Sequence, residues 1–286
     1  TVRYAAEVDG LDRVRMTPGS SGRDGWAVGN GSTLLHWTGM HWVPLAGPST
    51  RYNDVGMAGP KEGWLSAALG QVCRWNGTSW ACTALGDTTK SLAMVAANDG
   101  WAGGWGTLHR WNGQSWTKVS SPTSQTLYDM QARAANDIWA AGTNGTLLHY
   151  DGSTWALTSS PVSLHLLGIG IAAANDVWAV GQLGTMLHYN GSSWTLKPQV
   201  VPEMLWDVDL VPGAGGATGW AVGAAGTILK LQGGSWSRVP SPTGYDLYSV
   251  ATVDAQTAWA VGEGGVILYY GATPVRFNLH LPLTVR

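Results

Sequence analysis

Apolar residues recur along the chain in short blocks separated by turns rich in glycine, asparagine and aspartate. The clearest block reads Trp-Ala-Val-Gly or close to it, and a glycine turn and a second block similar to Leu-His-Tyr follow it. Short apolar runs bounded by turn residues are typical of β-strands, and helical periodicity is absent throughout. The pattern occurs seven times at intervals of 37 to 42 residues, beginning near Trp26, Trp64, Trp101, Trp139, Trp178, Trp220 and Trp259.

The fourth copy shows the elements of one repeat most clearly. Its predicted strands are residues 127–132, 138–142, 146–150 and 153–157. Asn-Gly or Asp-Gly between two strands is the strongest short-range signal for a β-hairpin. This signal precedes the last strand of four copies, at Asn76-Gly77, Asn112-Gly113, Asp151-Gly152 and Asn190-Gly191. Each repeat is therefore predicted to be a four-stranded antiparallel sheet.

Seven such units of about 40 residues predict an all-β, seven-bladed β-propeller that forms a single domain over residues 1–286. Each blade of a propeller is covered by its neighbours on both faces, so its two middle strands should be apolar on both sides. The large Trp fills the space between blades, while Ala and Gly let the sheets approach closely. A β-solenoid also stacks repeats face to face, but it uses shorter coils and lacks these hairpin turns.

Closure of the ring requires an outer strand for the seventh blade, and either end of the chain can supply it. The C-terminal segment 272–286 is a strand or tail in which apolar and polar residues alternate strictly from Val275 to Val285. Counting along the repeat places Val275 where other copies have an outer-strand Trp. The N-terminal run 2–8 competes for this place, because it leads directly into the first inner strand. We expect both termini to meet in one composite blade, and we favour the C-terminal segment as its outer strand.

Composition narrows the range of partners. Only 12% of the residues are charged and the net charge is −2, so there is no electrostatic case for a nucleic acid or an anionic membrane as the partner. No apolar run approaches the roughly 20 residues that cross a bilayer, so we expect no transmembrane segment. Thr1 is not a start residue, so we expect that a signal segment has been removed and that the protein is secreted or on the cell surface.

The two cysteines, Cys73 and Cys82, lie on either side of a predicted hairpin. If residues 76–79 form a four-residue loop, the two cysteines lie directly opposite each other, at a distance that a disulfide can span. A two-residue loop at 76–77 would offset them diagonally, which suits a bridge less well. A disulfide and a pair of buried free thiols remain alternatives, and a bridge would favour an oxidising compartment.

The phrase Gly-Trp-Ala-Val-Gly is complete at 25–29 and 219–223 and nearly complete at 178–181 and 259–262. These repeats resemble those of BNR/Asp-box-related propellers, in particular the photosystem II assembly-factor type. The resemblance covers almost the whole chain and implies the propeller fold. For function it implies only a range, from assembly factors and surface proteins to lectin-like binders and sialidase-like enzymes. The Asp-box is shortened here to Asn/Asp-Gly-x-Ser/Thr-Trp, and the Trp-Asp pair of WD40 repeats is missing.

Polar residues precede the aromatic position of the third strand, at His36, Arg74, Arg110, His149, His188, Lys230 and Tyr269. Acidic residues occupy the first turn of five copies, at Asp24, Glu62, Asp99, Asp137 and Asp176. Both sets should lie at the same end of the blade, and buried polar groups need partners. We therefore expect each His or Arg to hydrogen-bond to the acid of its own blade. Because the histidines belong to different blades, we expect no metal site, and we expect no cofactor.

Charged residues of the inner strands are candidates for the channel mouth. Arg13, Asp54, Asp129 and Asp207 occupy one equivalent place, which the other copies fill with Ala93, Gly168 and Ser249. Such a ring could hold a cation or a polar ligand, could raise a carboxylate pKa by mutual repulsion, or could simply hydrate the channel, which we favour. A sialidase-like mechanism would need an Arg cluster and a Tyr–Glu pair. No glutamate has a recognisable pairing with Tyr, so we do not expect an enzyme.

Two tryptophans depart from the repeat. Sixteen of the 18 occupy repeated positions, which leaves Trp105 in a turn and Trp206 at the start of an inner strand. Both regions belong to the face that propellers usually use for binding, where aromatic side chains could stack on sugar rings or anchor a protein. Packing beneath the connectors is the alternative. With their counterparts in other copies, the candidate binding residues are Trp105, Trp206, Tyr128, Tyr248, Leu69 and Leu183.

An abundant repeat without a catalytic set predicts a non-catalytic propeller that binds a protein partner through one face. Lectin-like binding of a glycan by the same aromatic residues is one alternative. The resemblance implies another, an accessory or assembly subunit that docks on a larger membrane complex.

Overall fold

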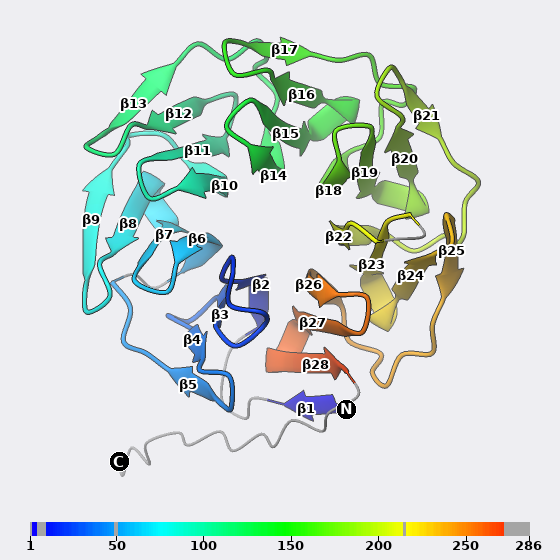
Figure 1. Ribbon diagram of the computed structural model, residues 1–286, viewed down its shortest axis with the longest axis horizontal. Coiled ribbons are helices and arrows are strands. Elements are labelled where there is room, and N and C mark those ends of the chain that lie inside the picture. The colour runs from blue at the N-terminus through cyan, green and yellow to red at the C-terminus, as the bar shows by residue number, and fades with distance from the viewer. Residues whose placement is uncertain (1, 5–9, 49–50, 214–215, 272–286) are drawn as a thin grey trace.

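Seven antiparallel sheets surround a central channel in the computed structural model (Figure 1). The structure describes residues 2–4, 10–48, 51–213 and 216–271. Six sheets consist of four consecutive strands, the first at the channel and the fourth at the rim, and we call them blades 1 to 6 in chain order. The seventh sheet, blade 7, closes the ring. The predicted seven-bladed β-propeller is therefore confirmed.

The strands of each blade run from the channel to the rim. Those of blades 1 to 3 are β2 (Leu11–Met16), β3 (Gly25–Gly29), β4 (Leu34–Trp37) and β5 (Trp42–Pro44); β6 (Tyr52–Gly59), β7 (Glu62–Ala67), β8 (Gln71–Trp75) and β9 (Trp80–Ala84); and β10 (Thr89–Ala96), β11 (Asp99–Gly104), β12 (Leu108–Trp111) and β13 (Trp116–Val119). Those of blades 4 to 6 are β14 (Leu127–Ala134), β15 (Asp137–Gly142), β16 (Leu147–Tyr150) and β17 (Trp155–Leu157); β18 (Leu166–Ala173), β19 (Asp176–Gly181), β20 (Met186–Tyr189) and β21 (Trp194–Leu196); and β22 (Leu205–Val211), β23 (Thr218–Gly223), β24 (Ile228–Gln232) and β25 (Ser235–Arg238).

Blade 7 takes strands from both ends of the described chain. Its inner strands are β26 (Leu247–Asp254), β27 (Thr257–Gly262) and β28 (Val266–Tyr270). The outer strand is β1 (Val2–Tyr4), which pairs antiparallel with β28 (Figure 1). The preference for the C-terminal segment as the outer strand was therefore wrong, because the N-terminal segment that leads into blade 1 already occupies that edge. Residues 272–286, for which a strand or tail was predicted, lie outside the described residues.

Single 3-10 turns join the second and third strands of five blades: η1 (Ala68–Gly70), η2 (Thr143–Gly145), η3 (Gln182–Gly184), η4 (Ala224–Gly226) and η5 (Glu263–Gly265). The middle residue of each turn has a left-handed backbone, with φ from 52° to 63°. Glycine and asparagine adopt this conformation with the least strain, as at Gly264 and Asn144. Blades 2 and 5 nevertheless place Leu69 and Leu183 there.

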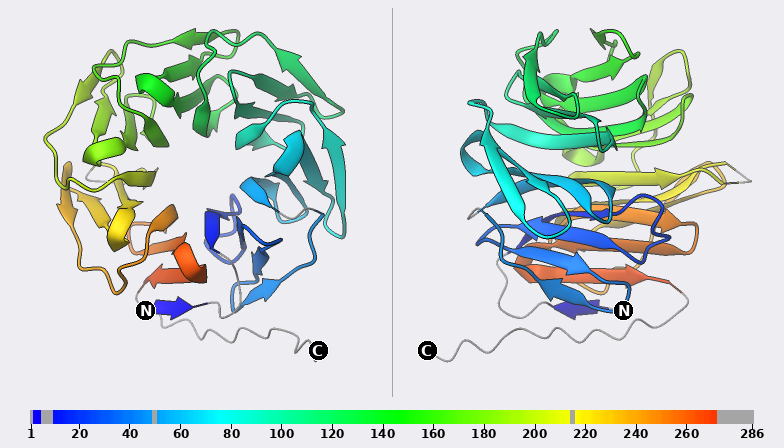
Figure 2. Two further views of the ribbon diagram at one scale, coloured as in Figure 1. Left: turned by 180° about the vertical axis from the view of Figure 1, so that it is seen from behind. Right: turned by 60° about the vertical axis from the view of Figure 1, so that its left-hand side comes forward.

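The tryptophan of each second strand fills the space between two blades. Trp139 of blade 4 is buried, and its ring centroid lies 4.8 Å from that of Tyr189 and 5.3 Å from that of Trp194, both in blade 5. His149 of its own blade stacks on it at 4.2 Å. Aromatic pairs of this kind add about 0.5–1.5 kcal/mol each beyond the area that they bury. The oblique view in Figure 2 shows the blades stacked face to face around the ring.

Glycine ends the Trp-Ala-Val-Gly phrase where another part of the backbone passes close by. A Cβ atom at Gly142 would lie 2.1 Å from the carbonyl oxygen of Thr126, in the connector that leads into β14. The connector and the end of β15 therefore pack backbone against backbone at this point.

Cys73 and Cys82 are directly opposed on β8 and β9 and are joined by a disulfide, with an S–S distance of 2.04 Å. The hairpin has the four-residue loop, because the Asn76 amide donates to the Ser79 carbonyl. The Asn76 carboxamide oxygen also accepts hydrogen bonds from the amides of Thr78 and Ser79. In the described residues no helix is of a length and apolarity to span a membrane.

Candidate binding face

The centre of the ring is built from the third residue of each inner strand. From blade 1 to blade 7 these residues are Arg13, Asp54, Ser91, Asp129, Gly168, Asp207 and Ser249. The prediction of Ala93 for blade 3 was wrong. Ser91 precedes its central Trp101 by ten residues, as Asp54 precedes Trp64, because the first hairpins of the two blades have equal length.

The three aspartates at this level each join one blade to the next. One carboxylate oxygen of each accepts a hydrogen bond from a backbone amide of the following inner strand. The pairs are Asp54 with Leu92 at 2.8 Å, Asp129 with Ile169 at 3.0 Å, and Asp207 with Val250 at 3.0 Å. The following blade has a small residue at the same place, Ser91, Gly168 or Ser249, which leaves room for the carboxylate.

Arg13 connects these carboxylates across the channel. Its guanidinium nitrogens lie 3.1 Å from Asp129, 3.4 Å from Asp207 and 3.7 Å from Asp54. Although burial opposes its charge, the three carboxylates raise the pKa of Arg13, so it stays protonated. Burial raises the pKa of Asp129 to about 6, against the opposing effect of Arg13 and Arg15. The carboxylates are fully buried and already partnered, so this cluster consolidates the centre of the ring. Within the described ranges no three His, Cys, Asp or Glu side chains form a group that could hold a metal ion.

A hollow of about 450 Å³ opens above Arg13 at the channel mouth. The second residue of every inner strand lines it, so all seven blades contribute one side chain. Blades 1 to 3 provide polar groups and blades 4 to 7 provide an apolar and aromatic arc. In blade order the seven residues are Asp12, Asn53, Lys90, Tyr128, Leu167, Trp206 and Tyr248.

The two halves of the hollow differ in chemistry. Trp206 and Tyr248 meet edge to face, with their ring centroids 5.7 Å apart. On the polar side, burial raises the pKa of Asp12, although the positive charge of the nearby Arg51 opposes this shift. Burial lowers the pKa of Lys90, and the charge of Arg51 lowers it further. A ligand that lies across the mouth therefore meets stacking surfaces on one side and charged hydrogen-bonding groups on the other.

The tips of three turns, in blades 2, 3 and 5, lie on the same face as this hollow. Leu69, Trp105 and Leu183 are 92%, 63% and 64% exposed. The turn after the second strand of a blade lies on the same face as the channel mouth, because the second strand ends next to the first residue of the inner strand. In blade 4, for example, Gly142 at the end of β15 pairs with Leu127 at the start of β14. Trp105 also forms an isolated bridge with Thr126, just before β14.

The structure therefore divides the six candidate residues into two sets. Tyr128, Trp206 and Tyr248 line the hollow, whereas Leu69, Trp105 and Leu183 lie outside it on the turn tips. Three polar residues that the inner strands contribute to the hollow, Asp12, Asn53 and Lys90, were not predicted from the sequence. Each immediately precedes the channel residue of its strand, at a register shift that occurs in every inner strand and that no local feature of the sequence marks.

The predicted pairing of the third-strand polar row is confirmed in five blades. His36 contacts Asp24 at 2.6 Å, His149 contacts Asp137 at 2.8 Å and His188 contacts Asp176 at 2.9 Å. Arg110 donates to Asp99 at 3.3 Å, and Arg74 donates to Glu62. In blade 6 Lys230 instead lies over the rings of Trp220 and Tyr270. Each of these six residues also packs against the central Trp of its own blade.

Comparison with known proteins supports the fold alone. No family model and no curated protein matches the chain. The structure is similar to that of YCF48 bound to D1 peptide, with a TM-score of 0.76 and 17% identity over 96% of this chain and 97% of that one. YCF48 from Cyanidioschyzon merolae has a TM-score of 0.74 and 16% identity, over 94% of this chain and 98% of the other. The WD40 repeats of RRP9 have a TM-score of 0.76 and 11% identity, over 94% and 99%. The chain is thus a seven-bladed propeller that is structurally similar to YCF48 and to WD40 proteins.

Proposed function

We propose that this propeller is a non-catalytic scaffold that binds a protein partner through the face around the channel mouth, the mouth face. The observation that carries the proposal is the hollow, with an aromatic and a charged side, together with three exposed apolar turn tips on the same face. Aromatic side chains in a partly desolvated hollow are typical anchors of protein interfaces. That YCF48, a propeller of the same fold, was solved with a D1 peptide bound supports a peptide or protein as the ligand.

Backbone strain at the turn tips supports this choice of face. Leu69 and Leu183 hold left-handed backbones at φ 60° and 55°, and their side chains extend into solvent. Such a conformation costs a residue with a Cβ atom on the order of 1 kcal/mol, and the exposed side chains of Leu69 and Leu183 recover little of it by burial in the monomer. Burial of the two leucines against a partner would offset it.

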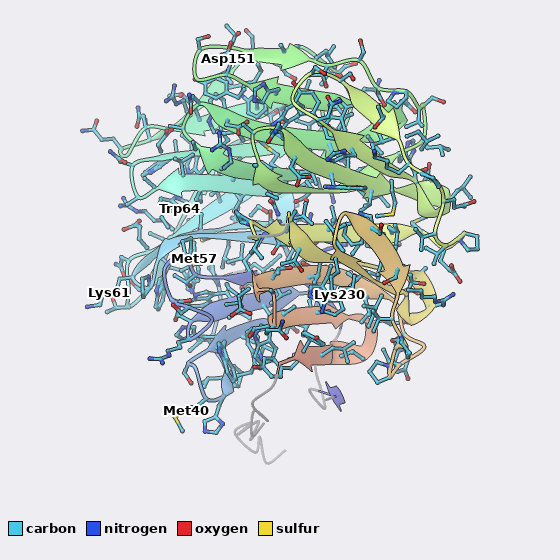
Figure 3. The ribbon with its side chains drawn as sticks, turned by 45° about the vertical axis from the view of Figure 1, so that its right-hand side comes forward. Met40, Met57, Lys61, Trp64, Asp151 and Lys230 are labelled. Atoms are coloured by element: carbon cyan, nitrogen blue, oxygen red, sulfur yellow. A yellow bond between two sulfur atoms is a disulfide. The ribbon has the colours of Figure 1, made fainter. Side chains whose placement is uncertain are left out.

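The test removes the two extra tryptophans together. Partners are first captured with a photoreactive amino acid in place of Ala225, an exposed residue at the tip of the blade 6 turn η4, and their affinity for the unaltered chain is then measured by biolayer interferometry. The double substitution Trp105→Ala and Trp206→Ala should weaken binding at least about 30-fold, because truncation of a hot-spot residue costs about 2 kcal/mol or more. Met40→Ala is the matched control, since Met40 is 67% exposed in the β4–β5 turn, away from the mouth face (Figure 3). Unchanged affinity in the double variant would exclude the mouth face as the site.

Binding of a glycan is a second candidate function. Trp206 and Tyr248 offer adjoining ring surfaces in a hollow that the Asn53 carboxamide also lines, and aromatic stacking combined with polar groups suits sugar rings. A glycan array separates the two functions: saturable binding that is lost in Trp206→Ala supports a lectin, and an array without binding excludes it.

The disulfide between Cys73 and Cys82 supports a secreted or cell-surface location, because such bonds persist in oxidising compartments. At that location the scaffold would serve as an accessory or assembly subunit of a larger complex. Copurification of the native protein with a membrane complex tests this role.

A further inference from the structure

The outer part of every blade interface follows one rule, with a single exception. In six blades the third strand carries an aromatic residue whose ring packs on the central Trp of the preceding blade, with centroids 4.6–5.6 Å apart. These residues are Trp37, Trp75, Trp111, Tyr150, Tyr189 and Tyr270. Blade 6 has Leu231 at the same register, opposite Gly219.

A hollow of about 500 Å³ lies where that ring is missing, between blades 5 and 6. Figure 1 shows these two blades, β18–β21 and β22–β25, side by side. Trp178, Met186, Leu231 and Trp236 provide its apolar walls, and Asp176, His188 and Lys197 provide its polar side. The volume lies within the range of about 300–1,000 Å³ that is typical of small-molecule sites. We call this hollow the blade 5–6 pocket.

The walls of the pocket are held in position before any ligand binds. The Asp176 carboxylate accepts a hydrogen bond from the Trp178 indole at 2.9 Å and contacts the His188 ring at 2.9 Å. His188 in turn lies against the Trp178 ring, with centroids 4.5 Å apart. Trp236 meets the same tryptophan edge to face at 5.5 Å. Preorganised walls lower the entropic cost of binding.

The blade 2–3 interface shows how an aromatic ring is held at the equivalent place. Arg74, the counterpart of His188, lies over both Trp64 and Trp111, with its guanidinium carbon 5.7 Å and 5.2 Å from their ring centroids. A ring that enters the blade 5–6 pocket would lie beside His188 and Trp236 and would meet little of the Trp178 surface, which is 5% exposed.

The charge of the pocket indicates what the ring should carry. Lys197 is anchored through its backbone amide, which donates to the Met186 carbonyl at 2.9 Å. No carboxylate of the described residues lies within 4 Å of its ammonium group. The Asp176 carboxylate, in contrast, is already engaged by Trp178 and His188. The pocket therefore offers one cation without an ionic partner beside an aromatic-sized space.

We propose that the blade 5–6 pocket binds a ligand with one aromatic ring and a carboxylate, of the class of indole-3-acetate. The ring takes the place that a third-strand aromatic residue fills in the other blades, and the carboxylate pairs with Lys197. This site lies on the rim, is separate from the mouth face and does not depend on the function proposed for that face.

The test titrates the full chain with indole-3-acetate and with neutral indole, by ligand-observed NMR and calorimetry. Saturable binding of both probes is expected. Leu231→Trp, which restores the repeat, should lower the affinity for both at least about tenfold, because the introduced ring occupies the space, and should raise the melting temperature. Leu231→Tyr provides a second variant that fills the pocket with the residue of blades 4, 5 and 7.

Lys197→Gln tests the contribution of the ligand carboxylate separately from that of the aromatic ring. It should weaken indole-3-acetate about fivefold to tenfold and leave indole unchanged. Lys61→Gln is the matched charge control, since Lys61 is exposed in the turn between β6 and β7, distant in the ring from the pocket (Figure 3). Absence of saturable binding by either probe, or full affinity in a folded Leu231→Trp or Leu231→Tyr variant, would overturn the site. Equal loss of both probes in Lys197→Gln would overturn the carboxylate assignment.

Discussion

The interface between blades 4 and 5 is bridged by side chains at both the centre and the rim. The interface between blades 5 and 6 has glycine contacts at the centre, a buried apolar layer next to them and a pocket at the rim. In the first, the Asp129 carboxylate accepts the Ile169 amide at 3.0 Å, and the Gln131 carboxamide oxygen accepts the Ile171 amide at 3.3 Å. At the rim of the same interface, Tyr189 lies on Trp139.

At the channel, glycines of blade 5 contact the backbone of blade 6 directly, in place of the side-chain bridges of the blade 4–5 interface. A Cβ atom at Gly168 would lie 2.7 Å from the Asp207 Cα atom, and one at Gly170 would lie 2.8 Å from the Val208 carbonyl oxygen. The two backbones therefore touch at the channel. At the rim, Leu231 replaces the aromatic residue and the blade 5–6 pocket opens.

The difference shows that one repeat can close the wedge between two blades in two ways. Polar side chains can bridge a wider gap at the centre, or glycines can remove the gap. The rim is a separate layer, because the aromatic residue there packs on the central Trp and not on the channel residues. A single replacement at the rim can thus create a pocket without disturbing the centre.

Removal of the central Trp at the fully bridged interface should have the largest effect. Trp139→Ala should lower the free energy of unfolding by about 4 kcal/mol, because a buried Trp leaves a large cavity. Urea denaturation measures this loss. Trp105→Ala, at an exposed turn tip, serves as the control and should change stability by no more than about 0.5 kcal/mol. Similar values for both variants would contradict the assignment of Trp139 to the core.

Gly168→Ala should disrupt the glycine-closed interface. The added methyl group meets the Asp207 backbone, which cannot rotate away, so the free energy of unfolding should fall by about 2 kcal/mol. Gly59→Ala is the control, because no atom lies within 4 Å of a Cβ at that position. A neutral Gly168→Ala variant would show that blades 5 and 6 are not in backbone contact.

Tyr189→Leu should make the rim of the blade 4–5 interface similar to that of the blade 5–6 interface, where the equivalent residue is Leu231. Loss of the ring contact with Trp139 should cost about 1–1.5 kcal/mol, measured by the same denaturation. The central bridges of Asp129 and Gln131 remain, so the variant should stay folded. A loss as large as that of Trp139→Ala would indicate that centre and rim are coupled.

The smallest net effect is expected from the exchange of the two rims. The combination of Tyr189→Leu and Leu231→Tyr should leave stability within about 0.5–1 kcal/mol of the unaltered chain, because the two residues contact different tryptophans and their effects should add. Thermal unfolding of the double variant and both single variants completes the cycle. A double variant that is no more stable than Tyr189→Leu alone would show that filling the blade 5–6 pocket does not stabilise the fold.

Much of the architecture followed from local features of the repeat. The pairs His149–Asp137 and His188–Asp176 were predictable because each lies within one hairpin, where register follows from loop length. Likewise, the four-residue loop at 76–79 places Cys73 opposite Cys82. The candidate face was only partly predictable. The extra aromatic residues at 105 and 206 were conspicuous, whereas Lys90 and Asn53 depend on a register shift that no local signal marks.

The amino-acid sequence by itself determined the seven sheets and the hairpins within them, because strand pairing inside a repeat depends on residues that are neighbours along the chain. Only the tertiary structure decided which terminus joins β28, how Arg13 reaches carboxylates of three blades, and that Leu231 leaves a space beside Trp178. These outcomes depend on distances between residues of different blades, which the closed ring sets and the repeat alone does not encode.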